Sequence, residues 1–283
     1  MLSVLRRSQL YVPGNNEKMI MKASSLDCDS VILDLEDAVP SAQKERARSL
    51  VRKMTSELDW GKKEVCVRTN SVATRWGKAD LDQLRSAERV DSLVIPKAEE
   101  DLTRVHRQTG KTLIPIIETA EGLEGIGTIV RSSGVDAVSF GAADFAFSVA
   151  GSVDSYLENP YVKTRIVVAA RSAGVDPIDN VFFDLKDAEG FRRQALHARA
   201  LGFSGKQLIH PSQVSVANEV FSPKPSELRW ARGVIKQYER AKGSAEGAFS
   251  LDGKLIDAVH YKIAKSLLKG SDRTSGNEHE GGR

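Results

Sequence analysis

The sequence predicts an α/β fold, a TIM (β/α)₈ barrel with a C-terminal helical extension. Three observations predict it. The chain has 283 residues, and one such barrel takes about 250. Short β-branched runs alternate with longer segments of helical periodicity, at a mean spacing of roughly thirty residues. Runs such as 31–33 and 113–117 are apolar without interruption, as is typical of parallel strands that helices cover on both faces.

Eight strands are expected, one for each β/α unit of the barrel. Each is a short apolar or β-branched run that follows a polar or glycine-containing segment. In chain order the expected strands are Ser8–Val12, Ser30–Asp34, Glu64–Thr69, Ser92–Pro96, Thr112–Glu118, Ala137–Gly141, Val181–Asp184 and Lys206–His210.

The segments between the strands have the spacing of amphipathic helices. Between residues 41 and 58, the apolar side chains of Ala47, Val51 and Met54 fall on one helical face. Glycines stand where a helix-like stretch gives way to a strand, and there a left-handed cap is expected. These glycines are Gly110, Gly134, Gly174 and Gly202.

The pattern changes near the C-terminus. Residues 225–241 form one more expected helix, and residues 243–253 are rich in Gly and Ser, as in a linker. Residues 255–268 are amphipathic but too short to fold alone, so we expect them to pack on their own barrel or on another subunit. The predicted organisation is a catalytic barrel domain over 1–242, a linker and lid segment over 243–270, and a disordered tail over 271–283.

Composition excludes several classes of partner. The net charge is +3, from 41 basic and 38 acidic residues, which gives no reason to expect nucleic acid. No run approaches the roughly 20 apolar residues of a membrane span, and the N-terminus does not resemble a signal peptide. Cys28 and Cys66 lack metal-ligand spacing and are expected to be buried, reduced thiols. We therefore expect a cytoplasmic protein.

Two carboxylates stand at the ends of consecutive strands. The active site of a TIM barrel lies at the C-terminal ends of its strands, where Glu118 ends one strand and Asp144 follows the next. Neighbouring strand ends are roughly 5 Å apart, so these carboxylates would repel each other without a cation between them. Mg²⁺ suits two carboxylates with water and substrate oxygens. The alternative is that one carboxylate forms a salt bridge and the other caps a helix.

Arg68 ends the third strand close to an acidic cluster. Its forked donors suit a substrate carboxylate or an oxyanion that develops on a thioester carbonyl. The alternative is an ion pair with Glu36 or Asp37. The cluster that includes Asp34 could hold metal-bound waters, or it could bind Arg68 and Lys97. We expect both, with Glu36 and Asp37 supporting the metal site and not ligating the ion directly.

The turn Gly141-Ala142-Ala143, just before Asp144, has only small side chains. Small side chains let backbone N–H groups approach a ligand, here a substrate carboxylate beside the metal. Such turns also occur for packing alone. His210, at the end of the last strand, is expected to make a structural hydrogen bond and to take no part in catalysis.

Several motifs in order resemble the citrate lyase β-subunit-like family, which includes malyl-CoA and citramalyl-CoA lyases and is related to the HpcH/HpaI aldolases. The resemblance covers roughly residues 7–262. The motifs are Tyr11-Val12-Pro13-Gly14-Asn15, Asp34-Leu35-Glu36-Asp37-Ala38-Val39, Val67-Arg68-Thr69-Asn70, Ile95-Pro96-Lys97, Ile116-Ile117-Glu118-Thr119, Gly141-Ala142-Ala143-Asp144, Gly205-Lys206-Gln207-Leu208-Ile209-His210-Pro211 and Asp252-Gly253-Lys254-Leu255-Ile256-Asp257.

The resemblance implies roles for the residues at the strand ends. Glu118 and Asp144 would be the Mg²⁺ ligands. Arg68 would contact the substrate and its enolate oxygen. The opening loop would lie near the CoA moiety, through Tyr11, Pro13 and Lys18.

The resemblance also implies an assembly. The C-terminal extension would reach over a neighbouring subunit of a homotrimer or hexamer, and Asp257 would complete that neighbour's site as a catalytic residue.

The activity so implied is that of a Mg²⁺-dependent carbon–carbon lyase. It would cleave or form a β-hydroxyacyl-CoA such as citramalyl-CoA or malyl-CoA, with acetyl-CoA and pyruvate or glyoxylate as the products of cleavage. The alternatives are a citrate lyase β subunit acting on a citryl-acyl-carrier protein, an aldolase acting on free 2-keto acids, and a non-catalytic protein that binds CoA esters.

Overall fold

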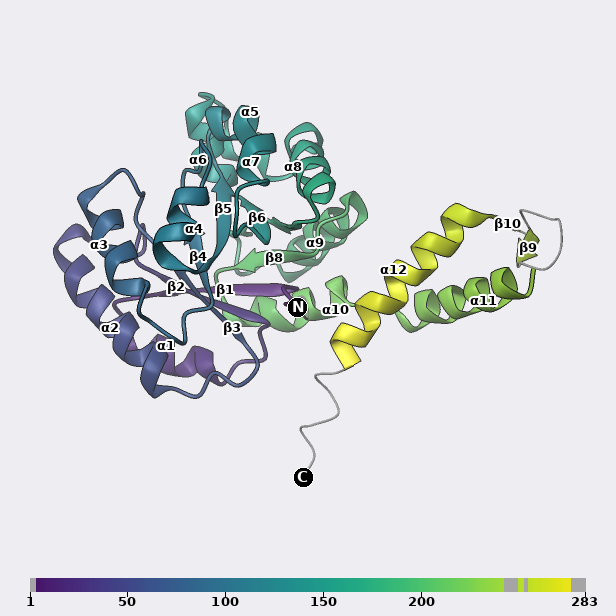
Figure 1. Ribbon diagram of the computed structural model, residues 1–283, viewed down its shortest axis with the longest axis horizontal. Helices are drawn as coiled ribbons and strands as arrows, with labels where there is room; N and C mark the ends of the chain where they lie inside the picture. The colour runs from purple at the N-terminus through teal and green to yellow at the C-terminus, as the bar shows by residue number, and fades with distance from the viewer. Residues whose placement is uncertain (1–3, 242–248, 252–253, 276–283) are drawn as a thin grey trace. The chain divides into compact units, whose positions relative to one another are not determined.

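The computed structural model describes residues 4–241, 249–251 and 254–275. Eight parallel strands close into a barrel in the order of the chain, with helices around the outside (Figure 1), so the predicted fold class is confirmed. The strands are β1 Ser8–Pro13, β2 Ser30–Asp34, β3 Glu64–Arg68, β4 Ser92–Ile95, β5 Thr112–Ile117, β6 Ala137–Phe140, β7 Asp176–Asp179 and β8 Gly205–Leu208.

Helices fill the connections between the strands. They are α1 Glu17–Ser24, α2 Lys44–Glu57, α3 Arg75–Leu84, α4 Thr103–Thr109, α5 Ala120–Ile129, α6 Ala142–Ser148, α7 Val153–Leu157, α8 Pro160–Ala173, α9 Ala188–Leu201 and α10 Val214–Phe221, with the 3₁₀ turns η1 Ser41–Gln43 and η2 Pro211–Gln213. The four expected left-handed glycines are confirmed, with φ of 68° at Gly110, 84° at Gly134, 74° at Gly174 and 108° at Gly202.

The predicted seventh strand, Val181–Asp184, is wrong. The strand that pairs with β6 and β8 is Asp176–Asp179, which contains a proline and two acids and so lacks a strand-like composition. This strand tolerates an acid in the barrel core because the carboxylate of Asp179 is buried between two ammonium groups. Its oxygens lie 2.8 Å from Lys163 Nζ and 2.6 Å from Lys206 Nζ.

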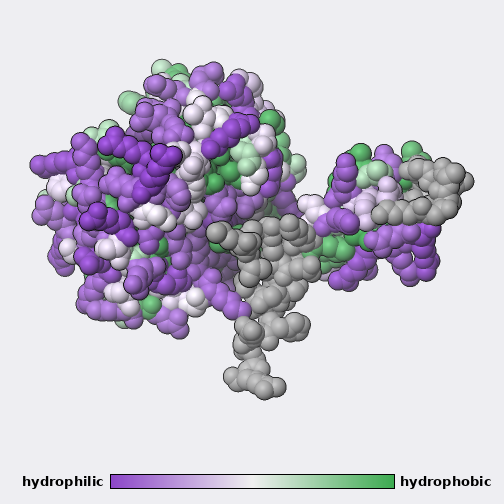
Figure 2. Space-filling model, in the orientation of Figure 1, coloured by the Kyte–Doolittle hydropathy of each residue, from purple (hydrophilic) through white to green (hydrophobic). Residues whose placement is uncertain are grey.

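Two apolar layers hold the barrel together. The larger layer lies between the strands and the surrounding helices. A smaller one fills the barrel interior, with Ile32, Cys66, Val94, Ile114, Ile116, Ala137 and Ile178 as its buried members. Hydrophilic side chains cover most of the visible outer face, with apolar patches between them (Figure 2).

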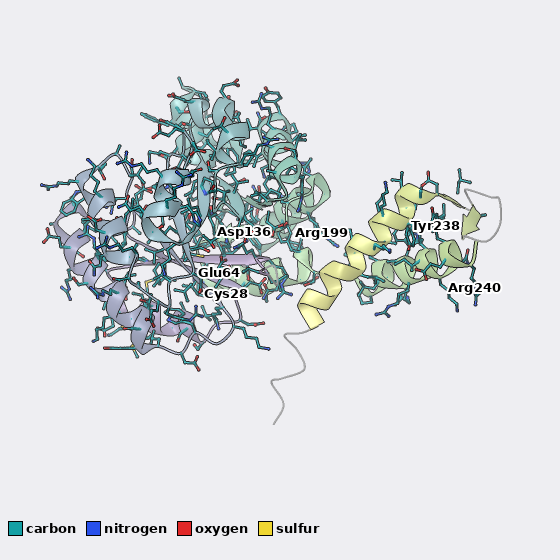
Figure 3. The ribbon with its side chains drawn as sticks, in the orientation of Figure 1. Cys28, Glu64, Asp136, Arg199, Tyr238 and Arg240 are labelled. Carbon is teal, nitrogen blue, oxygen red and sulfur yellow. The ribbon has the colours of Figure 1, made fainter. Side chains whose placement is uncertain are left out.

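A buried charge cluster closes the N-terminal end of the barrel. Arg6 donates two hydrogen bonds to Glu64, at 2.8 and 2.7 Å, and one to the half-exposed Asp136 at 3.0 Å. Glu64 and Asp136 are labelled in Figure 3. Ser30 and Ser92 donate to the same Glu64 carboxylate. Burial alone would raise the pKa of Glu64, but Arg6 and these hydrogen bonds outweigh it and lower that pKa. The polar opening of the barrel is therefore at the other end.

The chain divides into two compact units, Arg6–Phe221 and a second unit that begins at Ser222 and includes residues 4–5. In the second unit, α11 Pro225–Ala241 packs on α12 Ala258–Ser275, and β9 Phe249–Leu251 pairs antiparallel with β10 Lys254–Ile256. Its small core contains Ala231, Val234, Ile256 and Ala264.

Helix α11, placed with the barrel in the predicted organisation, thus belongs to the C-terminal unit. Helix α12 continues through Ser275, into the segment expected to be a disordered tail. Residues 243–248 and 252–253 of the expected linker lie outside the described part of the chain, as do residues 242 and 276–283. Among the helices that are described, none is both long and apolar enough to cross a membrane.

Candidate active site

A cavity of about 490 Å³ opens at the C-terminal ends of the strands. This volume is within the range of small-molecule sites, about 300–1,000 Å³. Most of the site residues predicted from the sequence line it, including both proposed metal ligands. The predicted residues in its wall are Tyr11, Pro13, Asp37, Arg68, Glu118, Gly141, Ala142, Ala143 and Asp144.

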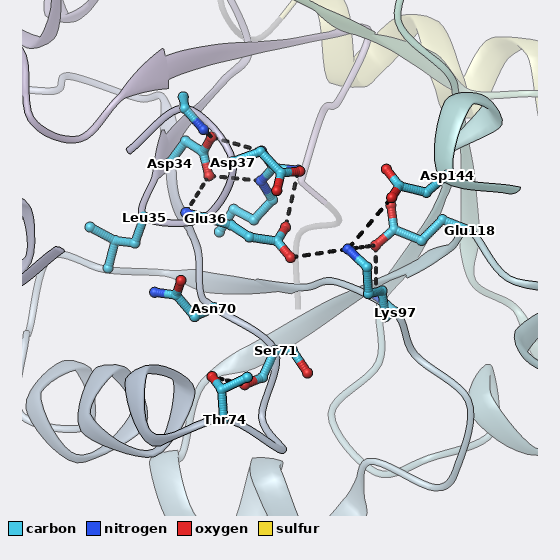
Figure 4. Close-up of polar contacts among 12 residues, drawn as sticks. Asp34, Leu35, Glu36, Asp37, Asn70, Ser71, Thr74, Lys97, Glu118 and Asp144 are labelled. Carbon is cyan, nitrogen blue, oxygen red and sulfur yellow. Dashed lines mark hydrogen bonds and ion pairs between the residues drawn. The ribbon is translucent and has the colours of Figure 1, made fainter. Parts of the chain in front are cut away.

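Glu118 and Asp144 both line this cavity, and both contact the same lysine side chain. Glu118 follows β5 and its side chain is 4% exposed, whereas Asp144 lies in the first turn of α6 and its side chain is 44% exposed. Each carboxylate contacts the ammonium of Lys97, with Oε1 of Glu118 at 3.9 Å and Oδ1 of Asp144 at 3.7 Å (Figure 4). Burial raises the pKa of Glu118 to about 7, although Lys97 opposes the shift. A further cation beside Glu118 would favour its ionised form.

Lys97 contacts more of the carboxylates of the site than its sequence position suggested. Its backbone has φ of 48°, in the left-handed region, and its N–H donates to Glu118 Oε1 at 2.7 Å. Its ammonium also lies 3.3 Å from Glu36 Oε1, so three carboxylates share it. Burial alone would lower the pKa of Lys97, but the carboxylates of Glu118, Glu36 and Asp144 outweigh it and raise that pKa.

The donor set fits a hard divalent cation. The three carboxylates around Lys97 offer only oxygen atoms, and one ammonium supplies a single positive charge among them. Within the described residues no group of three or more His, Cys, Asp or Glu side chains has metal-binding geometry. A pair of carboxylates with open positions for water and substrate oxygens is a common Mg²⁺ arrangement. Glu118 and Asp144 are therefore the residues that would hold the ion.

Gly141 is required at its position because of Glu118. A Cβ atom there would lie 2.5 Å from Oε2 and 2.6 Å from Cβ of Glu118. The Gly141 N–H also donates to Ile117 O at 3.0 Å, which fixes this backbone against β5. The small residue therefore leaves room for the buried carboxylate.

We expect Gly141→Ala to weaken Mg²⁺ binding by about tenfold or more, because the added methyl group must displace the Glu118 carboxylate. Isothermal titration with Mg²⁺ checks this. Gly127→Ala is the control, since a Cβ there meets only the flexible end of Arg131 at 3.5 Å. Equal affinity in the two variants would contradict the role assigned to Gly141.

Arg68 is anchored by the acidic cluster and also faces the cavity. Its Nε and Nη2 each donate to Asp34 at 2.7 Å. Its Nη1 lies 3.2 Å from Glu36 and 3.4 Å from Asp37, so the ion pairs given as the alternative are present. The guanidinium carbon lies 5.0 Å from the centre of the Tyr11 ring. This arrangement holds a permanent positive charge rigidly in the cavity wall.

Two predicted residues of the barrel unit, Glu36 and Lys18, are not among the residues that line the cavity. Lys18 is exposed on α1, while its neighbour Met19 lines the cavity. Asp257 belongs to the C-terminal unit, where it caps α12. Its Oδ1 accepts the N–H of Val259 at 2.9 Å and lies 2.7 Å from Nδ1 of His260. The hydrogen bond from His260 lowers the pKa of Asp257.

The apolar wall of the cavity and one of its polar residues are not predicted from the sequence. Phe140, Val181, Phe183 and Ile209 line it together with Gln207. Alternation along the expected strand Lys206–His210 places residues 207 and 209 on one face. Val181 and Phe183 were not expected in the cavity wall, because the seventh strand was wrongly predicted over them. His210 caps η2, with Nδ1 2.8 Å from Ser212 Oγ, as expected for a structural role.

Several known proteins are similar to this chain over most of its length. The chain is 36% identical to the mitochondrial citramalyl-CoA lyase of Rattus norvegicus, over 94% of this chain and 86% of that protein. It is 34% identical to the L-malyl-CoA/beta-methylmalyl-CoA lyase of Cereibacter sphaeroides, over 95% of each. The crystal structure of CitE from Mycobacterium tuberculosis in complex with magnesium, acetoacetate and coenzyme A matches with a TM-score of 0.80 and 28% identity, over 96% of this chain and 100% of that one. The family model for HpcH/HpaI aldolase/citrate lyase matches residues 7–211, and the chain therefore belongs to this family.

Proposed function

We propose that this protein is a Mg²⁺-dependent carbon–carbon lyase that cleaves, or forms, a β-hydroxyacyl-CoA such as citramalyl-CoA or malyl-CoA. The products of cleavage would be acetyl-CoA and pyruvate or glyoxylate. The observation that carries the proposal is the convergence of Glu118, Asp144 and Arg68 on one cavity at the strand ends. The lyase names of the similar proteins support it.

Each residue of the site would have a defined part in this reaction. Mg²⁺ held by Glu118 and Asp144 would polarise the carboxylate and hydroxyl oxygens of the substrate. Arg68, fixed by Asp34, would stabilise the negative charge that develops on the thioester carbonyl oxygen as the carbon–carbon bond breaks. Glu36 holds both Arg68 and Lys97 in place, and Asp37 supports Arg68 from the rim of the cavity.

The remaining predicted residues would orient the substrate. Gly141, Ala142 and Ala143 leave space for the substrate carboxylate beside the ion. Tyr11 and Pro13 in the cavity wall, with the exposed Lys18 nearby in sequence, would contact the CoA moiety. Lys18 would do so through its charge, since CoA carries phosphate groups.

Asp257 is proposed to protonate the enolate carbon of the departing acetyl-CoA, or to deprotonate the acetyl methyl group in the reverse direction. We expect Asp257→Ala to lose about a hundredfold or more in kcat and to keep Mg²⁺ binding, measured by steady-state turnover and by calorimetry. Glu239→Gln, an exposed acid of the same unit, is the control. Unchanged turnover in Asp257→Ala would remove this residue from the scheme.

We further propose that Asp257 serves the site of a neighbouring subunit in a homotrimer or hexamer. Apolar side chains on the C-terminal unit support a covering partner, since Leu255 is 70%, Val259 58% and Ile263 46% exposed in the single chain. A cytoplasmic location is supported by the two free, buried thiols.

The test of the activity is a mass-spectrometric screen of malyl-, citramalyl- and citryl-CoA, with and without Mg²⁺. We expect one or more of these to yield acetyl-CoA and a keto acid, with a loss of at least about a hundredfold in rate after the ion is chelated. Citryl-acyl-carrier protein and free hydroxy acids are assayed beside them. Turnover of those alone would favour the citrate lyase subunit or the free-acid aldolase. Binding of CoA esters without any product would favour the non-catalytic alternative.

A further inference from the structure

Two glutamines face the inside of the barrel at the base of the cavity. Gln9 on β1 and Gln207 on β8 are register partners on neighbouring parallel strands. Gln9 is completely buried and Gln207 is 3% exposed. Side chains alternate along a strand, so Gln9 on β1 faces the same way as Tyr11. Tyr11, Gln207 and Ile209 all line the cavity, which places the amide of Gln9 one layer beneath it.

Three of the four amide atoms of these glutamines have no hydrogen-bond partner in the part of the chain that the structure describes. Nε2 and Oε1 of Gln9 and Nε2 of Gln207 are buried and have no hydrogen-bond partner among the described residues. The two amides do not bond to each other. The barrel interior contains apolar side chains such as Ile32, Ile114 and Ile178. The register partner of Gln9 on β2 is Ser30, whose hydroxyl donates to Glu64. A buried amide costs free energy until a polar group meets it.

Because the amides lie at the base of the cavity, only one part of the substrate can reach them. CoA is bulky and must remain at the mouth of a cavity of about 490 Å³, so the acyl end enters first. In the proposed reaction, the carboxylate and the hydroxyl are held near Glu118 and Asp144. The group left to point toward the base is the substituent on the hydroxyl-bearing carbon, which becomes the side chain of the keto acid. The walls beside it include Phe140 and Val181, which are apolar.

We propose that Gln207 is a specificity-determining residue that binds an oxygen atom on this substituent. Among the β-hydroxyacyl-CoA thioesters of the proposed reaction, those whose hydroxyl-bearing carbon carries an oxygen-containing group then have the highest kcat/KM. Malyl-CoA, with a hydrogen there, and citramalyl-CoA, with a methyl group, remain substrates of lower kcat/KM. A hydrogen atom or a methyl group at that carbon leaves the Gln207 amide without a hydrogen-bond partner. A site built to hydrogen-bond a substrate oxygen discriminates strongly against an analogue that lacks it. This inference rests on the proposed lyase function and narrows its substrate class.

The experiment uses the condensation direction, with acetyl-CoA, Mg²⁺ and a matched pair of keto acids. Hydroxypyruvate and 2-oxobutyrate have nearly the same shape and differ by a hydroxyl in place of a methyl group. Glyoxylate, which has no substituent, serves as the reference acceptor. We expect the wild-type protein to favour hydroxypyruvate over 2-oxobutyrate by about tenfold or more in kcat/KM.

Gln207→Met keeps the length of the side chain and removes its amide, so we expect the kcat/KM ratio of the pair to fall to about one. Gln9→Leu should keep the wild-type ratio within about twofold, because Gln9 is outside the cavity wall and no hydrogen bond joins its amide to that of Gln207. Gln108→Met on α4 is the control, since Gln108 is exposed and outside the cavity wall, and it should keep the wild-type ratio. The midpoint of thermal unfolding should not fall in Gln207→Met, because the unliganded protein loses only an unmatched amide.

Two results would overturn the assignment. The first is a wild-type ratio near one while all three keto acids condense. The second is a wild-type preference that Gln207→Met retains while its unfolding midpoint falls, which would mean that the amides hold a structural water. Absence of condensation with every keto acid would contradict the proposed lyase function itself, and this inference would fall with it.

Discussion

Glu118→Gln is expected to abolish Mg²⁺-dependent turnover, with a loss in kcat/KM of about a thousandfold, which is roughly 4 kcal/mol of transition-state stabilisation. Glutamine has the shape of glutamate, and its side-chain oxygen can still accept the Lys97 N–H that Glu118 accepts at 2.7 Å. What is lost is the negative charge, which leaves Asp144 as the single carboxylate proposed to ligate the ion. Calorimetric titration with Mg²⁺ and steady-state kinetics measure the two consequences separately.

We expect Glu118→Gln to fold normally and to be as stable as the wild-type protein. Burial raises the pKa of Glu118 to about 7, so a neutral side chain is tolerated there, and we expect the thermal midpoint to stay the same or to rise. Glu121→Gln is the matched control, because Glu121 is an exposed acid in the first turn of α5. It should keep activity within about twofold, as surface substitutions usually do. Full Mg²⁺ affinity in Glu118→Gln would end the metal assignment.

Asp179→Asn is expected to lower the free energy of unfolding by about 3–5 kcal/mol, the usual cost of breaking a buried ion pair on one side. The carboxylate of Asp179 is shared by Lys163 and Lys206, and all three side chains are 0% exposed. Lys206 also donates to Asn180 O and to Gln194 Oε1, both at 2.6 Å. Without the carboxylate, two buried ammonium groups lack a counter-charge. Equilibrium unfolding in urea measures the loss.

The pH dependence gives a second measure of this network. Burial lowers the pKa of Lys206 to about 8, against the opposing effect of Asp179. The folded state therefore releases this proton more readily than the unfolded state. The cost of the buried charge is present below about pH 8 and is relieved as the pH rises above it. The deficit of Asp179→Asn relative to the wild type should accordingly be largest near neutral pH and smaller at alkaline pH.

Asp176→Asn is the control for this prediction. Asp176 lies on the same strand and pairs with Arg171 at 3.2 Å, but the side chains of Asp176 and Arg171 are 24% and 48% exposed. An exposed pair contributes about 1 kcal/mol or less. A loss in Asp179→Asn no greater than that in Asp176→Asn would contradict the assignment of a stabilising role to the buried carboxylate.

The strand ends show why much of the cavity could be predicted from sequence. Parallel strands of a barrel all end on one side, so any polar residue that follows a strand is directed to the same opening. Glu118, Asp144 and Arg68 follow this rule and line one cavity. The left-handed glycines, such as Gly174, could be predicted for a similar reason, since a helix that ends before a strand needs a backbone turn that glycine adopts without strain.

Lys97, Asp179 and Gln207 show what could not be predicted. Lys97 follows an expected strand, but its place among three carboxylates depends on side chains from other strands. The Asp179 strand was missed because its buried charge is balanced by Lys163, 16 positions earlier, and Lys206, 27 positions later. Gln9 and Gln207 are register partners on the first and last strands of the barrel, almost 200 positions apart in the sequence.

The sequence by itself determined the barrel, the side on which it opens and the residue types that face the opening, because these follow from local periodicity and from the parallel direction of the strands. Only the tertiary structure decided which charges are shared, which buried groups are left unmatched, and that α11 joins the C-terminal unit. Those outcomes depend on desolvation and on contacts between residues far apart in the chain, and no local pattern records them.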